Sequence, residues 1–86
     1  MTILYEFSSK WCKPCKLMKP LVDSVAFKMN IDVVEVDVES QPDIAQRYHV
    51  MSLPALILFE NDKPVASHVG SMTETELEKF VSRISE

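Results

Sequence analysis

The chain has 86 residues, and this length predicts one compact domain over residues 1–86. Hydrophobic residues make up 47% and charged residues 26% of the chain, which favours a globular fold over a disordered tail. The formal net charge of −4 disfavours the phosphate attraction that dominates nucleic-acid binding, so we expect no nucleic-acid partner.

No apolar stretch approaches the roughly 18 residues of a membrane-spanning helix, and the first ten residues lack the pattern of a secretory signal. We therefore expect a cytoplasmic monomer with no membrane partner. The two cysteines, Cys12 and Cys15, are too close in sequence for a bridge between them to add much stability. In a reducing compartment, such a pair is typical of catalysis or metal binding.

The first half of the chain shows strand, helix and strand patterns in turn. Residues 2–8 are rich in Ile, Tyr and Phe and end in serines, which predicts a strand. From Cys12 onward, apolar residues recur at helical spacing, which predicts a helix with one buried stripe and a kink near Pro20. Residues 31–38 alternate as in a strand with one apolar face. The helical stripe consists of Leu17, Leu21, Val25 and Met29, with Met18 and Val22 beside them.

The second half of the chain begins with a short helix and a hairpin. Residues 41–50 carry apolar side chains at helical spacing after Pro42. Residues 54–60 form a continuous apolar run, which predicts a strand covered on both faces. A turn at residues 61–63 then leads into a strand that begins at Pro64.

A last helix is predicted from its start signal. Thr73 is followed by Glu76 three positions later, which is the pattern of a capping box. The helical crossover between the first two strands implies parallel pairing, whereas the hairpin is antiparallel. The sequence thus predicts an α/β fold of order βαβαββα, in which three helices flank a four-stranded mixed sheet. The apolar face of the last helix consists of Leu77, Phe80, Val81 and Ile84.

Cys12 and Cys15 stand at the predicted junction of the first strand and the first helix. The helix dipole, its free N–H groups and the nearby Lys13 favour an anion, so we expect the pKa of the Cys12 thiol to lie below the usual value of about 8.5. Cys15, one turn further in, is expected to be more buried and to suit attack on a mixed disulfide. Pro14 fits the first helical turn between them. This pattern favours a reversible redox couple.

Two other interpretations of the pair stay open. The cysteines could supply half of a zinc site, but His49 and His68 stand alone in the sequence, so that site would need a dimer. The cysteines could also be inert core residues, although Trp, Lys and Pro around them are typical of an exposed helix mouth. We expect neither a metal nor a cofactor.

Residues 10–20, KWCKPCKLMKP, resemble the active-site segment of the thioredoxin family, which usually has Gly in place of Lys13. Residues 52–59, SLPALILF, are similar to the family strand that begins with a cis-proline. Residues 68–81 resemble its final strand, glycine turn and closing helix. Together with residues 33–42, these segments cover nearly the whole chain, without counterparts of the family's first strand and helix. The resemblance implies a minimal thioredoxin-like fold.

The resemblance also implies a thiol–disulfide oxidoreductase that reduces protein disulfides, with Cys12 as the nucleophile and Cys15 as the resolving thiol. The implied partners are disulfide-containing proteins and a reductase such as a thioredoxin reductase. Two alternatives remain: a glutaredoxin-like protein that uses glutathione, and a non-enzymatic binding module with the same fold. Trp11 before Cys12 and the absence of a Gly-Gly pair in the sequence are signals against the first alternative.

A substrate groove is implied around Pro54. Base rates alone, about one cis bond in twenty before proline, would favour a trans Leu53–Pro54 bond, but the resemblance implies cis, with the backbone of Leu53 free to pair with a substrate. Gly70, the only glycine, indicates positive φ, close backbone approach or an ordinary turn. The expected binding residues are Trp11, Lys13, Pro14, Leu53, Pro54, Val69 and Gly70.

The groove is expected to have an exposed apolar rim and a positive field beside it. These features predict partner surfaces that are acidic or at least not basic. The rim residues are Trp11, Met51, Leu53, Val69 and Met72, and the lysines are Lys10, Lys13, Lys16 and Lys19.

Glu6 occupies the position where the family typically has a buried aspartate that assists proton transfer. Burial beside Leu4 would raise its pKa toward neutrality, and the alternative is a partly exposed carboxylate without a role. The family often has a lysine nearby on the next strand, where this chain has Glu35, so either one carboxyl group is protonated or Glu35 turns to solvent or a lysine. We expect the replacement of this lysine by Glu35 to raise the pKa of Glu6 further and to make turnover unusually pH-dependent. Ser8 replaces a common tryptophan, which leaves Trp11 as the sole fluorescence reporter.

Overall fold

The computed structural model describes residues 1–83 and has the predicted order of elements, βαβαββα. Ile84, predicted to extend the last helical face, lies outside the described residues. The elements are β1 (Thr2–Ser8), α1 (Lys13–Met29), β2 (Asp32–Asp37), α2 (Pro42–Arg47), β3 (Ala55–Glu60), β4 (Lys63–Val69) and α3 (Glu74–Ser82).

The four strands form one mixed sheet in the order β2-β1-β3-β4. The pairing of β1 with β2 is parallel, as the helical crossover predicts, and the hairpin of β3 and β4 is antiparallel. β1 also pairs with β3 in an antiparallel arrangement, so the first strand lies inside the sheet. The loop from β1 into α1 therefore starts at a central strand of the sheet.

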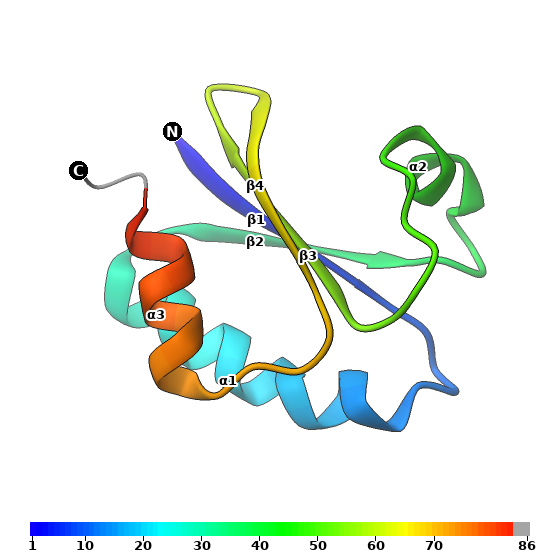
Figure 1. Ribbon diagram of the computed structural model, residues 1–86, viewed down its shortest axis with the longest axis horizontal. Coiled ribbons are helices and arrows are strands. Elements are labelled where there is room, and N and C mark those ends of the chain that lie inside the picture. Colours follow the sequence, from blue (N-terminus) through cyan, green and yellow to red (C-terminus); the bar gives the residue numbers. More distant parts are fainter. Residues whose placement is uncertain (84–86) are drawn as a thin grey trace.

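Helices cover both faces of the sheet, as Figure 1 shows: α1 and α3 lie on one side and α2 on the other. The side chains of β3 alternate between the two layers, because successive residues of a strand point to opposite faces. Leu56 and Leu58 pack under α1 and α3, whereas Ile57 and Phe59 pack on the side of α2. This central strand is buried on both faces, as its continuous apolar run predicts.

α1 runs without interruption through Pro20, so the prediction of one helix rather than two is confirmed, and a kink there stays a prediction. Its buried residues are Cys15, Met18, Val22, Val25 and Ala26. The predicted burial of Leu17 is wrong, since that side chain is 67% exposed. An α-helix turns by about 40° more than one full turn in every four residues, so a strict four-residue repeat drifts off the buried face.

The strands of the hairpin begin within one residue of their predicted starts, β3 at Ala55 and β4 at Lys63, and α3 begins after Thr73 as predicted. Asn61 and Asp62 both have positive φ, which matches the twist of a tight hairpin. Pro64 lies on the edge strand β4 beside a register irregularity, where a missing N–H group is tolerated. Thr73 and Glu76 form the predicted capping box at the start of α3. No helix within residues 1–83 is long and apolar enough to cross a membrane.

Candidate active site

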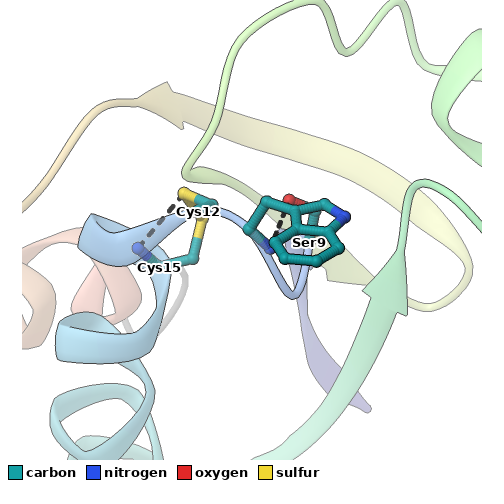
Figure 2. The surroundings of a disulfide bond; sticks show 4 residues. Ser9, Cys12 and Cys15 are labelled. Atoms are coloured by element: carbon teal, nitrogen blue, oxygen red, sulfur yellow. Dashed lines mark hydrogen bonds between the residues drawn. A yellow bond between two sulfur atoms is a disulfide. The ribbon is translucent and has the colours of Figure 1, made fainter.

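Cys12 and Cys15 are joined by a disulfide at the N-terminal end of α1, with their Cα atoms 5.3 Å apart (Figure 2). Cys12 is the N-cap residue of the helix and Cys15 lies in its first turn, which brings the two sulfur atoms together. Cys12 is partly exposed, whereas Cys15 is only 2% exposed, so the predicted difference in burial is confirmed. The pair has one thiol position open to solvent and one beneath it.

The start of α1 directs one backbone N–H group at the sulfur of Cys12. The N–H group of Cys15 donates a hydrogen bond to Sγ of Cys12 over 3.3 Å (Figure 2). The loop before it is held by a bond from the N–H of Cys12 to the carbonyl oxygen of Ser9, 3.1 Å long. The first turn contains Lys13 and no acidic residue. After reduction, this N–H group and the helix dipole would stabilise a thiolate on Cys12.

The turn before β3 lies beside the first turn of α1 in both views (Figures 1 and 2). The Leu53–Pro54 peptide bond in this turn is cis, and Pro54 is buried. The N–H of Gly70 donates to the carbonyl oxygen of Pro54 over 2.8 Å, which connects this turn to the residue after β4. Gly70 has a φ of 107°, so the prediction of positive φ at this glycine is confirmed.

The apolar rim is smaller than predicted. Trp11, Met51 and Val69 are 77%, 92% and 60% exposed, as expected for a contact surface. Leu53 and Met72 are partly buried and pack against the two core layers, so the prediction that they are exposed is wrong. An apolar side chain at the edge of a core layer packs against that layer where it can reach it, because removing apolar surface from water is favourable.

The positive field beside the rim is also smaller than predicted. Lys10, Lys13 and Lys16 are exposed, and Lys10 lies over the ring of Trp11, with Nζ 5.5 Å from the ring centroid. Lys19 instead pairs with acidic side chains, which reduces its contribution to this field.

Glu6 is 2% exposed, so the alternative of a partly exposed carboxylate is wrong. Its Oε1 atom has no hydrogen-bond partner among the described residues. Burial, the nearby Glu35 and, to a smaller extent, Asp23 raise the pKa of Glu6 to about 7, against the opposing effect of Lys19. A carboxyl group with this pKa is present in both protonation states near neutrality.

Glu35 lies opposite Glu6 in the register of β1 and β2, and its carboxylate is 3.1 Å from Nζ of Lys19. Of the outcomes that the sequence left open, Glu35 thus turns to a lysine. This lysine, a residue that the sequence analysis did not connect with Glu6, stands four positions after Cys15 on the same helix face. This spacing of four residues from Cys15 was the signal in the sequence that could have connected Lys19 with the site.

A pocket of about 220 Å³ lies beside these residues. It is lined by Ser8, Ser9, Lys10, Cys15, Lys16, Lys19, Glu35 and Asp37.

Comparison with known proteins shows the family to which the chain is related. The family model named Thioredoxin matches residues 1–83. The chain belongs to the thioredoxin family. It is 35% identical over 82 residues to the thioredoxin of Chlamydia trachomatis, which covers 94% of this chain and 80% of that thioredoxin. Identity to the thioredoxin of Staphylococcus aureus is 33% over 82 residues, covering 93% of this chain and 79% of the relative.

Solved thioredoxins share the fold. A mutant thioredoxin from Halobacterium salinarum superposes with a TM-score of 0.94 at 29% identity, covering 99% of this chain and 75% of that one. Mitochondrial thioredoxin 3 of Saccharomyces cerevisiae, in its oxidised form, gives 0.87 at 28% identity, with 95% and 77% covered. This thioredoxin-family protein, with a disulfide between Cys12 and Cys15, is a thiol–disulfide oxidoreductase.

Proposed function

We propose that Cys12 is the nucleophile and Cys15 the resolving thiol in the reduction of protein disulfides. The observation that carries this assignment is the asymmetry of the pair. Cys12 is partly exposed and accepts an N–H hydrogen bond at the helix start, whereas Cys15 is buried beneath it. The outer sulfur is thus the one that a substrate reaches and the one that the helix stabilises as an anion.

Reduction then proceeds in two exchanges. The Cys12 thiolate attacks one sulfur of a substrate disulfide, so a mixed disulfide forms and the other substrate sulfur leaves as a thiolate, which takes a proton from solvent. Cys15 loses its proton, and its thiolate attacks the Cys12 sulfur and releases the second substrate thiol. Two electrons have passed to the substrate, and the Cys12–Cys15 disulfide is the product. A reductase partner returns two electrons to this disulfide.

Glu6 is the proposed acid and base for Cys15. It lies on the sheet face that α1 covers, since Leu4, two residues earlier, packs against that helix. Its pKa of about 7 lets the carboxylate accept a proton from the Cys15 thiol and return it in the reverse direction. A pKa far from neutrality in either direction would leave Glu6 almost entirely in one protonation state at working pH.

The proposed substrate groove runs between the first turn of α1 and the turn before β3. An extended segment of the substrate would pair with the backbone of Leu53, as in strand addition to a sheet. The hydrogen bond between Gly70 and Pro54 supports a fixed groove wall, and the exposed Trp11 supplies apolar contact area. The residues proposed to contact substrate are Trp11, Lys13, Pro14, Leu53, Pro54, Val69 and Gly70.

We also propose that the protein works as a cytoplasmic monomer of one domain. A reducing compartment suits this function, because the Cys12–Cys15 couple must be returned to the dithiol form after each cycle.

Insulin reduction under dithiothreitol tests the assignment of the nucleophile. The wild type should accelerate the precipitation of the insulin B chain, and Cys12→Ser should reduce this to the rate of dithiothreitol alone. Thr75→Ala, an exposed substitution on α3, serves as the control and should match the wild type. A Cys12→Ser protein that still accelerates precipitation would remove Cys12 from the nucleophilic role.

A further inference from the structure

Two carboxyl groups share the sheet face that α1 covers. Glu6 on β1 and Glu35 on β2 are Cα partners in the parallel register, and paired residues on neighbouring strands point to the same face. Neighbouring strands lie about 4.8 Å apart, so the two side chains leave the backbone within reach of each other. Like charges in such a cross-strand pair destabilise each other.

Lys19, on the helix that covers this face, contacts the Glu35 member of the pair. Its Nζ atom is 3.1 Å from the Glu35 carboxylate and 3.6 Å from that of Asp23. The side chains of Lys19 and Glu35 are 52% and 46% exposed, so the ion pair lies at the solvent edge while Glu6 stays buried. Lys19, Glu35 and Cys15 line the same pocket of about 220 Å³.

We propose that Lys19 is a positioning residue for proton transfer by Glu6: it holds the Glu35 carboxylate at the solvent edge of the pocket and balances its charge. This inference rests on the proposed function, in which Glu6 exchanges a proton with Cys15. Without Lys19, the charge of Glu35 would act on Glu6 unopposed and would keep its proton in place. The thioredoxin-family protein would then have less carboxylate available to accept the proton of Cys15.

The other groups around Glu6 agree with this role. β3 places the apolar Leu56 opposite Glu6, so the charged groups that face Glu6 come from β2 and α1 alone among the described residues. Glu35 and Asp23 raise the pKa of Glu6, and Lys19 lowers it. These groups are Glu35 on β2, and Lys19 and Asp23 on α1.

A double-mutant cycle on the oxidised protein tests the proposal, with the titration of Glu6 followed by carboxyl-carbon NMR. The oxidised form is chosen because the disulfide removes both thiols from the titration. Lys19→Gln should move the midpoint of Glu6 upward, and Glu35→Gln should move it downward. In the Glu35→Gln background, the added Lys19→Gln change should have a smaller effect, because the positioned carboxylate is gone and only the direct attraction between Lys19 and Glu6 is lost.

Lys28→Gln is the matched control. Lys28 lies on the same helix and pairs with Glu74 and Glu78 of α3, so the variant loses the same charge and the same kind of contact far from Glu6. The Glu6 midpoint should stay unchanged in this variant. With Lys19→Gln, insulin reduction at pH 7 should fall about twofold, since a rise of roughly half a pH unit halves the ionised fraction of a group that titrates near 7.

The proposal is overturned if Lys19→Gln leaves the Glu6 midpoint unchanged. It is also overturned if the shift is the same in both backgrounds, because Lys19 would then act on Glu6 directly and not through Glu35. Failure of the proposed function has a different signature. If Glu6→Gln leaves the pH profile of insulin reduction unchanged, Glu6 is not the acid and base, whatever Lys19 does to its midpoint.

Discussion

The N–H group of Gly70 donates a hydrogen bond to the carbonyl oxygen of Pro54 over 2.8 Å, so the residue after β4 supports the turn before β3. Gly70 makes this contact at a φ of 107°, a conformation that residues with a Cβ atom rarely adopt. No atom lies within 4 Å of the position that a Cβ would occupy. The need for glycine here is therefore a matter of backbone conformation and not of space.

Gly70→Ala should lower the free energy of unfolding by about 1 to 2 kcal/mol, because alanine is strained at this positive φ although its Cβ atom meets no other atom. Urea denaturation of the oxidised protein measures this difference. The neighbouring exposed Ser71 provides the control, and Ser71→Ala should stay within about 0.5 kcal/mol of the wild type. Equal stability of Gly70→Ala and the wild type would mean that the turn accepts another conformation.

Trp11→Ala should impair protein substrates more than small ones. Trp11 is 77% exposed next to Cys12, so its ring is available to a docked chain, and we expect it to take no part in the thiol chemistry. We expect kcat/KM for insulin to fall about five- to tenfold, a loss typical of an aromatic contact residue. The rate of direct reaction of the reduced protein with DTNB should change by less than about twofold.

Phe27→Ala is the matched control for Trp11, since Phe27 is another exposed aromatic residue, 88% exposed, near the far end of α1. It should leave both rates unchanged. Equal losses for insulin and DTNB in Trp11→Ala would show that the indole affects Cys12 itself and not substrate docking.

Cys15→Ser should trap the mixed disulfide between Cys12 and the substrate. Cys12 can still attack a substrate disulfide, but no buried thiolate remains to release the product. Incubation of the reduced variant with insulin should yield a covalent adduct that mass spectrometry detects and excess dithiothreitol removes. Cys12→Ser should form no such adduct, and an adduct on Cys15 in that variant would reverse the proposed roles of the two thiols.

Glu6→Gln should change how stability depends on pH. In the folded protein the pKa of Glu6 is raised from 4.5 to about 7, so between these values the folded state holds a proton that the unfolded chain has released. Stability therefore falls as pH rises through this window, and the full penalty is present above pH 7. Relative to the wild type, the free energy of unfolding of Glu6→Gln should rise by roughly 2 to 3 kcal/mol between pH 5 and pH 8.

Guanidinium denaturation at several pH values, at constant ionic strength, measures this change. Glu39→Gln, an exposed acidic position after β2, is the control and should run parallel to the wild type. A parallel course for Glu6→Gln as well would show that the carboxyl group titrates normally in the folded protein. The same variant should flatten the pH dependence of insulin reduction near pH 7, as the loss of an acid and base requires.

Most of the fold was predictable because its signals are local. The bounds of β1 match residues 2–8, and the capping box of Thr73 and Glu76 marks the start of α3. Leu17 shows where such reasoning fails: two overlapping repeats compete on α1, and only contact with the sheet decides which of them is buried. The partial burial of Leu53 likewise depends on the space left at the edge of a core layer.

The candidate site was predictable in its cysteines and in the burial of Glu6 beside Glu35, but not in the lysine that pairs with Glu35. The spacing of Cys12 and Cys15 fixes their relative depth once a helix begins there. The partner of Glu35 depends on the crossing of α1 over β2, and the four-residue spacing from Cys15 indicates only that Lys19 lies on the same helix face. Only the packed structure selects Lys19, through its distance of 3.1 Å from the carboxylate.

Cys12 is also the residue that caps α1, since its sulfur accepts the N–H bond that a serine or aspartate side chain would otherwise accept. Under the proposed roles, the sulfur atom that exchanges partners in each cycle is thus the same atom that caps the start of the helix. Serine at this position removes the exchangeable sulfur but keeps a favoured cap, whereas alanine removes both. A loss of stability in a Cys12→Ala enzyme would therefore include a frayed helix end, typically worth about 1 kcal/mol, that has nothing to do with redox chemistry.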